Sequence, residues 1–242
     1  MFTKQKAYLG ISGNFHAEKA PWSSARHPLP IPPTPYAANV AERIAACNPD
    51  MRLVYVVRNP LERYISHFLQ RTKAGLETRS FDETFENLEN EPCAWQGRYY
   101  YQLSQYMQFF PKDQLLVISF DEIKSDTQSV IQKLYRFLDV PEIKPETSSE
   151  KVHNASGKVY RKNAFGLAVL GFYRRYVEQK NLPFRFKKLF KDIANWGGKP
   201  VEKPRLTTDQ KKLLIDFYRD DNRQLEEEFG VRTSQWFGGE HD

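Results

Sequence analysis

The sequence predicts an α/β fold with a mainly parallel sheet, and two observations support this prediction. Residues 53–57 and 115–118 are short runs of apolar and β-branched residues, the composition of buried strands. Segments with the apolar spacing of amphipathic helices follow each run. Strands that alternate with helices favour a parallel sheet covered by helices. We expect one domain, with a core over 1–145 and a basic, mostly helical part over 146–242.

The sequence of the first fifty residues predicts a short strand, a loop and a helix. The strand spans 14–19, and a proline-rich loop follows over 27–35. Residues 48–50, with the sequence Asn-Pro-Asp, are typical of the turn that ends the helix. The apolar face of this helix is formed by Val40, Ala41, Ile44 and Ala45.

A second helix is predicted directly after the first buried run. Asn59 is its expected N-cap, Pro60 takes the first helical position and Glu62 the third. Gly75 is expected to end it, because glycine adopts the left-handed conformation found after helix C-termini. The apolar stripe of the helix consists of Leu61, Tyr64, Ile65, Phe68 and Leu69.

Two more helices are predicted before the second buried run. A capping box of Ser80 and Glu83 indicates the start of one, and Pro111 the end of the other. Their apolar residues are Phe81, Phe85 and Leu88 in the first and Tyr99, Leu103, Tyr106, Met107 and Phe110 in the second.

The remaining predicted helices follow the second buried run. Ser125 and Gln128 have the spacing of a helix cap, and Thr207 with Gln210 marks the start of the last helix, which Gly230 ends. The apolar residues are Val130, Ile131, Leu134, Phe137 and Leu138 in the first helix and Leu213, Leu214, Phe217 and Leu225 in the last.

The composition favours a folded globule that does not span a membrane. Forty per cent of the residues are hydrophobic, yet no apolar run approaches the ~20 residues that a membrane span requires. The N-terminus lacks the apolar core of a secretory signal. Cys47 and Cys93 form neither a metal-ligand spacing nor a disulfide framework, so we expect no metal and a cytoplasmic location.

Basic residues are concentrated in one segment of a chain whose net charge is +6. Between Lys158 and Lys191 there are ten Lys or Arg residues and one acid, Glu178. Such a segment suits a nucleotide, an anionic glycan, a nucleic acid or a membrane surface. It is equally compatible with a solvated helical face that binds nothing.

Arg58 is the strongest candidate for a ligand-binding residue. In open parallel sheets, ligands bind beyond the carboxyl ends of the strands, where Arg58 is expected. The helix N-terminus after it offers free N–H groups to an anion, and the guanidinium group can hold a phosphate with two hydrogen bonds. The Ser66 hydroxyl, about two turns along the same helix, would reach a ligand that lies along the helix.

The segment 58–68, RNPLERYISHF, resembles the 3′-phosphate-binding motif of sulfotransferases that use 3′-phosphoadenylyl sulfate. Residues 18–21, EKAP, resemble the E-K-[ST]-P segment of heparan sulfate sulfotransferases and related bacterial enzymes. Residues 109–117 and 137–140 resemble the helix, strand and helix end that follow, and 217–225 resemble the tail of bacterial members. The resemblance therefore covers nearly the whole chain.

The resemblance implies a three-layer, P-loop-like fold and specific residue roles. Arg58 and Ser66 would hold the 3′-phosphate of the nucleotide, and Lys19 would contact the transferring group or the acceptor. Glu18 and His16 are the nearest candidates for the base that deprotonates the acceptor. Residues 153–158 resemble the nucleotide-contacting loop of the family, which implies that Gly157, Lys158, Arg161 and Lys162 bind the nucleotide.

One expected segment has no counterpart near the start of the sequence. Sulfotransferase domains open with a strand and a loop of the form K-x-G-T-[ST], which holds the 5′-phosphosulfate group. Residues 10–14, GISGN, are the only glycine-bearing stretch there and contain no lysine. We therefore expect an N-terminally truncated domain with unpaired strand edges, low stability, and self-association or completion by another chain.

The predicted function is transfer of a sulfuryl group from 3′-phosphoadenylyl sulfate to an acceptor hydroxyl or amine on a glycan, lipid or small molecule. One alternative is a catalytically inactive fragment that still binds the nucleotide or a partner. Another is a basic protein that binds nucleic acid or a membrane surface, although the resemblance makes a nucleic-acid partner unexpected. The sequence does not identify the acceptor.

Overall fold

The computed structural model describes residues 39–142, 159–177 and 184–237. All of them belong to one compact unit of the chain, Pro32–Asp242. The predicted strand at 14–19 and the proline-rich loop at 27–35 lie outside the described residues. Helix α1, Val40–Cys47, lies where the sequence predicts it, and a turn follows at residues 49–50.

The two predicted strands form a parallel pair, which confirms an α/β fold with a parallel sheet in the described part of the chain. Strand β1, Leu53–Val57, pairs with β2, Leu115–Ser119, and Val57 is opposite Ser119. The prediction that β1 is buried on both faces is wrong, because Val54 and Val56 are 40% and 51% exposed. Successive strand side chains point to opposite faces, and only the face that carries Tyr55 and Val57 packs on the core.

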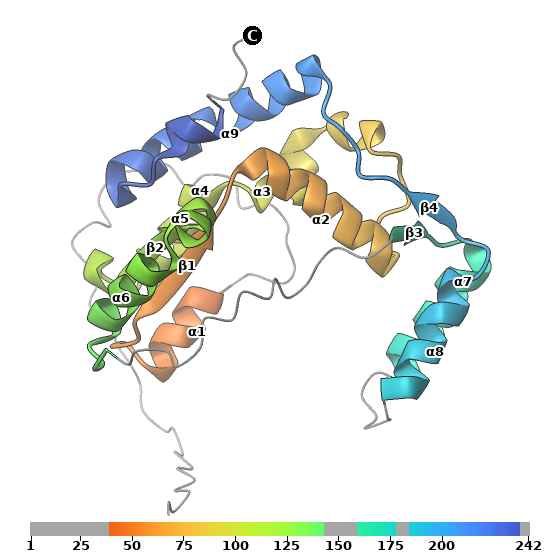
Figure 1. The fold of residues 1–242 in the computed structure, drawn as a ribbon, viewed down its shortest axis with the longest axis horizontal. Helices are drawn as coiled ribbons and strands as arrows, with labels where there is room; N and C mark the ends of the chain where they lie inside the picture. The colour runs from red at the N-terminus through yellow and green to blue at the C-terminus, as the bar shows by residue number, and fades with distance from the viewer. Residues whose placement is uncertain (1–38, 143–158, 178–183, 238–242) are drawn as a thin grey trace, which may run out of the picture. The chain divides into compact units, whose positions relative to one another are not determined.

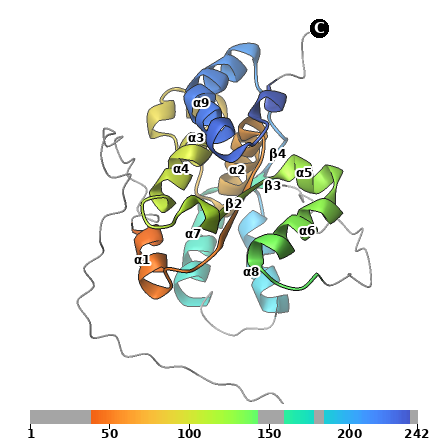
Figure 2. The same ribbon diagram turned by 90° about the vertical axis from the view of Figure 1, so that its left-hand side faces the viewer.

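A second strand pair, which the sequence did not predict, is antiparallel. Strand β3, Val159–Arg161, pairs with β4, Lys199–Val201. Between them in the chain lie α7, Ala164–Phe172, the short π-helix η4, Tyr173–Val177, and α8, Phe184–Asn195. Figures 1 and 2 show α7 and α8 side by side.

Helix α2, Pro60–Ala74, has the predicted ends. The Asn59 side chain accepts a hydrogen bond from the Leu61 N–H, and Gly75 ends the helix at a φ of 69°. Gly75 also allows α7 to approach, since a Cβ at this position would lie 2.9 Å from Leu167 Cδ2. The sequence of α2 therefore determines where it begins and ends.

Two groups of buried side chains form the core. In one, Tyr64 and Phe68 of α2 pack on Leu214 and Tyr218 of α9, Thr208–Phe229. In the other, residues meet from β1, β2, α4, Tyr99–Tyr106, α9 and the C-terminal turn η5, Thr233–Trp236. The members of this second group are Val57, Tyr99, Leu103, Val117, Leu225, Val231 and Trp236.

The helix predicted at Ser80 is replaced by shorter elements. The capping box forms, since Ser80 N–H donates to Glu83 Oε2 at 2.5 Å and Glu83 N–H to Ser80 Oγ at 3.3 Å. The chain then makes two 3₁₀ turns, η1, Asp82–Phe85, and η2, Leu88–Asn90, before α3, Pro92–Trp95. Packing explains the difference, because the Phe81 ring contacts the rings of Tyr64 and Phe68 of α2, a contact that sequence spacing does not reveal.

The helices on either side of β2 differ from the prediction at their ends. Helix α4, Tyr99–Tyr106, ends earlier than expected, and the 3₁₀ turn η3, Lys112–Gln114, leads into β2. After β2, an unpredicted helix, α5, Phe120–Ser125, precedes α6, Thr127–Leu138. Asp126, not Ser125, caps α6, because its carboxylate accepts the Ser129 N–H.

Helix α9 has the predicted capping box of Thr207 and Gln210 and ends at Gly230. Its buried face is rotated from the expected one, since Leu213 is exposed whereas Tyr218 and Asp221 are buried. None of the helices in the described ranges combines the length and the apolar character that a membrane crossing requires.

Asp221 of α9 caps the N-terminus of α4. Its two carboxylate oxygens accept the backbone N–H groups of Tyr100 and Tyr101, both at 2.9 Å. Helix α4 has no side-chain cap from its own N-cap residue, Arg98. Burial raises the pKa of Asp221 to about 6, although these hydrogen bonds favour the charged form. A tertiary contact thus replaces a local cap.

We predict that Asp221→Ala lowers the free energy of unfolding by roughly 2–4 kcal/mol, because it leaves two buried N–H groups without an acceptor. Urea unfolding measures the change. Asp220→Ala is the matched control, since that carboxylate is 83% exposed and its loss should stay within about 0.5 kcal/mol. Equal losses for the two variants would contradict the capping role.

Candidate functional site

Arg58 lies between the carboxyl end of β1 and the N-terminus of α2. Figure 1 shows β1 leading directly into this helix. Arg58 is half-buried, and the α2 N-terminus beside it is capped by Asn59. The free N–H groups of a helix N-terminus and a guanidinium group on its capping loop both favour an anion.

The backbone of Arg58 is fixed by the buried hydroxyl of Tyr99. The hydroxyl donates to the Arg58 carbonyl oxygen at 2.9 Å and accepts the Arg58 N–H at 3.4 Å. Burial raises the pKa of Tyr99 to about 12, which keeps this hydroxyl protonated. Among the described residues, no carboxylate forms an ion pair with the Arg58 side chain, so its charge is available to a ligand.

Further basic residues lie along α2, Arg63 near its start and Arg71 in its last turn. Arg63 donates to Gln96 Oε1 at 3.1 Å, and Arg71 lies 3.8 Å from the Glu77 carboxylate. His67 stands between them in the sequence, and its pKa is lowered to about 4, first by burial and then by the charges of Arg63, Arg71 and Arg58. Its buried Nδ1 has no hydrogen-bond partner within the described ranges. These observations indicate a region of positive potential.

Ser66 lies in the middle of α2 and is half-buried. It precedes His67 and stands eight positions after Arg58 in the chain, about two helical turns. The structure therefore places Arg58, Ser66 and His67 on one strand–helix unit. A ligand that contacted both Arg58 and Ser66 would have to lie along the N-terminal half of α2.

Arg161 and Lys162 lie at the other end of α2. Lys162 Nζ donates to the Lys73 carbonyl oxygen, and Arg174 donates to the Ala74 carbonyl oxygen at 2.7 Å. Arg161 donates to the Arg79 carbonyl oxygen at 2.9 Å. Burial, and then the neighbouring cations, lowers the pKa of Lys162.

These contacts satisfy carbonyl groups at the C-terminal end of the helix. Since α2 has 15 residues, this end is roughly 20 Å from Arg58. The structure does not bring Arg161 and Lys162 together with Arg58, and their role toward a nucleotide stays a prediction.

The other predicted site residues, Lys19, Glu18, His16, Gly157 and Lys158, lie outside the described residues. In the ranges that the structure describes, no group of three His, Cys, Asp or Glu side chains could hold a metal ion. Sequence reasoning missed Tyr99 and Arg63. Tyr99 carries no local signal, because its role depends on a contact between residues 41 positions apart.

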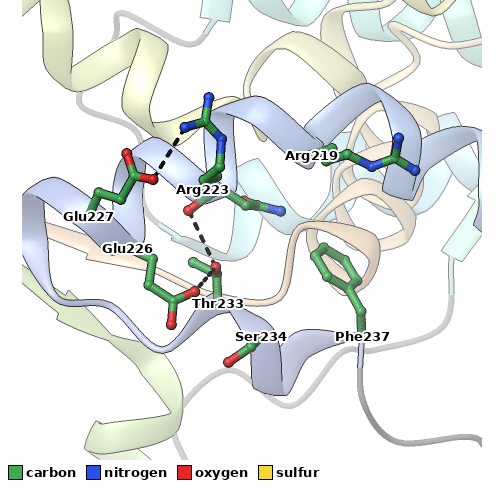
Figure 3. A pocket seen from close by; sticks show the side chains of 8 residues that line it. Arg219, Arg223, Glu226, Glu227, Thr233, Ser234 and Phe237 are labelled. Carbon is green, nitrogen blue, oxygen red and sulfur yellow. Dashed lines mark hydrogen bonds and ion pairs between the residues drawn. The ribbon is translucent and has the colours of Figure 1, made fainter.

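Two hollows lie apart from the predicted residues. One, of about 330 Å³, lies between α9 and η5 (Figure 3). Four of its polar side chains are paired: Thr233 Oγ1 donates to Glu226 Oε2 at 2.7 Å, and Arg223 pairs with Glu227 at 3.2 Å. The buried side-chain amide of Asn222 has no hydrogen-bond partner within the described residues. The other, of about 340 Å³, is lined by α1 and Met51. Neither contains a sequence-predicted site residue.

Comparison with known families decides the class of the protein. The family model described as the sulfotransferase domain matches residues 37–227. The chain belongs to the sulfotransferase domain family. The matched range contains the β1–α2 junction with Arg58 and Ser66, as well as β3 and the α7–α8 pair.

Individual sulfotransferases resemble parts of the chain. The chain is 29% identical to a flavonol sulfotransferase-like protein of Flaveria bidentis over 54% of this chain and 43% of that protein. It is 31% identical to a mouse heparan sulfate glucosamine 3-O-sulfotransferase 3B1 over 42% of this chain and 28% of that protein. It is 26% identical to a bifunctional heparan sulfate N-deacetylase/N-sulfotransferase 1 of Caenorhabditis briggsae over 45% of this chain and 15% of that protein. Each match spans less than half the length of the relative.

Among solved structures, a sulfotransferase from Alicyclobacillus acidocaldarius superposes with a TM-score of 0.49 and 19% sequence identity. The superposition covers 81% of this chain and 61% of the other.

We predict that His67 remains neutral well below the usual titration range of histidine. NMR titration of its ring proton should give a pKa near 4, against an ordinary value of 6.5. Because the folded-state pKa is lowered, His67 stabilises the fold fully above about pH 6.5, and this contribution is lost as the pH falls toward 4. A titration midpoint between about 6 and 7 would contradict a buried, positively charged environment.

Proposed function

We propose that this sulfotransferase domain binds 3′-phosphoadenylyl sulfate, and that Arg58 and Ser66 hold the 3′-phosphate of the nucleotide. The observation that supports this proposal most is the half-buried Arg58 at the junction of β1 and α2, with which no carboxylate of the described residues forms an ion pair. The neighbouring Arg63 adds positive charge, and after burial this charge is the next cause of the low pKa of His67, which fits a dianionic ligand. The Ser66 hydroxyl supplies a further donor along α2.

The proposed reaction is an in-line displacement at sulfur. An acceptor oxygen or nitrogen forms a bond to sulfur, while the bond from sulfur to the 5′-phosphate oxygen breaks and adenosine 3′,5′-bisphosphate leaves. The proton of the acceptor passes to a base. The described residues contribute positioning, because a phosphate held by Arg58 fixes the far end of the donor relative to the acceptor.

The catalytic roles belong to the same proposal. Lys19 would stabilise charge on the sulfuryl oxygens, and Glu18 or His16 would accept the proton of the acceptor. The names of the relatives mention flavonol and heparan sulfate glucosamine as acceptors. For this chain we propose only the chemical class that they share, an acceptor hydroxyl or amine.

We predict that Arg58→Ala weakens binding of adenosine 3′,5′-bisphosphate by at least ~2 kcal/mol, or about 30-fold, because a charge-assisted hydrogen bond is lost. Isothermal titration calorimetry measures the affinity. Arg52→Ala is the matched control: Arg52 lies at the other end of the same strand and donates to the Phe137 carbonyl oxygen at 2.6 Å.

Equal affinity for the Arg58→Ala variant and the parent chain would sink the proposed site. Nucleotide binding without turnover of 3′-phosphoadenylyl sulfate would leave the site in place and favour a catalytically inactive domain. A folded chain that does not bind the nucleotide would mean that the described residues are insufficient to form the site.

We predict that Lys162→Ala lowers the melting temperature but changes the nucleotide affinity by less than about twofold. The reason is that Lys162 Nζ is bonded to a carbonyl oxygen at the C-terminal end of α2, roughly 20 Å from Arg58. Calorimetric titration and thermal unfolding of one sample measure both quantities. A loss of affinity above about tenfold would instead place Lys162 in the nucleotide site, as the sequence predicts.

A further inference from the structure

Helices α7 and α8 expose an apolar surface that the proposed function does not use. Eight apolar residues in this region recur at helical spacing and are exposed to solvent. Four of them lie on α7 and η4, three lie on α8, and one directly follows α8. We call this set the apolar stripe; its members are Phe165, Ala168, Phe172, Tyr176, Phe186, Leu189, Ile193 and Trp196. Contiguous exposed apolar surface of this kind marks an interaction site more often than chance.

The two halves of the apolar stripe meet. The rings of Phe165 and Trp196 contact edge to face, with centroids 6.2 Å apart. At the other end of α7, Phe172 contacts both Tyr176 at 5.1 Å and Phe190 of α8 at 6.5 Å. The stripe is therefore one surface formed by both helices and not two separate ones.

The stripe is not the face that joins the two helices. Phe190 and Ala194 of α8 pack toward α7, and a Cβ at Gly166 would lie 2.2 Å from the Ala194 carbonyl oxygen. Leu167 of α7 faces Gly75 at the end of α2. The packing between α7 and α8 thus rests largely on these residues, and among the described residues the stripe joins it only through the rings of Phe165, Phe172 and Trp196.

Basic side chains flank the stripe. The described parts of the segment from Ala164 to Trp196 contain six basic residues and one acid, Asp192. Helix α7 itself has no charged residue, and the cations lie on η4 and α8, next to members of the stripe in the sequence. The basic residues are Arg174, Arg175, Arg185, Lys187, Lys188 and Lys191.

We propose that the apolar stripe docks onto an anionic lipid surface, with the rings inserted at the headgroup level and the flanking cations bound to lipid phosphates. An amphipathic helix with aromatic residues on one face and Lys or Arg beside it lies in the plane of such a surface. Each cation near an anionic leaflet adds to the attraction. Trp and Tyr are the side chains that prefer the membrane–water interface, and Trp196 is 74% exposed.

Charge argues against the other occupants. Two copies of the chain that met through this surface would bring together two clusters in which, among the described residues, six cations face one acid, which is repulsive. A nucleic acid could use the cations that alternate with aromatic residues along α8, but it would leave the uncharged α7 half of the stripe without phosphate contacts. An anionic lipid surface satisfies both the apolar and the basic parts.

The test is flotation of the full chain with vesicles of phosphatidylcholine, with and without about 30 mol% phosphatidylglycerol, at about 0.1 M salt. We expect binding only to the vesicles that contain phosphatidylglycerol. Leu189→Glu should weaken this binding at least about tenfold, because it places a negative charge in the stripe. Leu213→Glu is the matched control, since Leu213 of α9 is 49% exposed and Leu189 is 52% exposed.

Insertion of the apolar stripe into the lipid is measured separately, by fluorescence quenching. In a Trp22→Phe background, vesicles with bromine on the acyl chains should quench the fluorescence of Trp196, and Trp196→Phe should remove most of that quenching, because the remaining Trp95 and Trp236 are buried. The proposal is overturned if the folded chain ignores the anionic vesicles, or if Leu189→Glu and Leu213→Glu bind them equally. It is also overturned if binding occurs without quenching, which would indicate attraction by charge alone.

Two further outcomes would replace the lipid with another partner. Dimerisation that Leu189→Glu abolishes, without vesicle binding, would make a second copy the occupant. Salt-sensitive binding to DNA without vesicle binding would make it a nucleic acid. None of these results depends on nucleotide binding, so the two proposals stand or fall separately.

Discussion

The candidate site depends on a hydrogen-bonded connection that starts at Asp221. Its carboxylate caps the N-terminus of α4, the first residue of that helix is Tyr99, and the Tyr99 hydroxyl holds the backbone of Arg58 on both its N–H and its carbonyl. A buried carboxylate is unfavourable by itself, as its raised pKa shows, and it is retained because two backbone donors need it. The C-terminal helix thereby fixes the conformation of a strand end on which the proposed phosphate contact relies.

Helix α2 has different chemistry at its two ends. At the N-terminus, Arg58 and Arg63 supply positive charge, and His67 is neutral. No carboxylate of the described residues forms an ion pair with Arg58. At the C-terminus, Lys162 and Arg174 bond to carbonyl groups, and Gly75 admits Leu167. Basic residues in this family member thus divide into those that satisfy the backbone and those that remain free for an anion. The exposed cations beside the apolar stripe, Arg174 excepted, have no such backbone contact among the described residues.

The sequence predicted the parts of the fold that local chemistry determines. The strands 53–57 and 115–118, the ends of α2, and the capping box of α9 follow from apolar runs, Asn59 with Pro60, Gly75, and Thr207 with Gln210. The sequence-based prediction failed where tertiary packing determines the local structure. The Phe81 ring contacts Tyr64 and Phe68, and there the chain forms 3₁₀ turns in place of the predicted helix. For the candidate site, a sequence motif predicts Arg58 and Ser66, and their role stays a prediction. Tyr99 and Asp221 act through contacts between residues 41 and 120 positions apart, which sequence spacing does not reveal.

The central claim is that the Arg58 guanidinium binds the 3′-phosphate and not some other part of the nucleotide. The most direct measurement compares the affinities of the parent chain and Arg58→Ala for adenosine 3′,5′-bisphosphate and for adenosine 5′-monophosphate, which lacks that phosphate. The account predicts that the parent prefers the bisphosphate by at least about 30-fold and that Arg58→Ala loses most of this preference. An Arg58→Ala variant that binds both nucleotides more weakly by the same factor would contradict it.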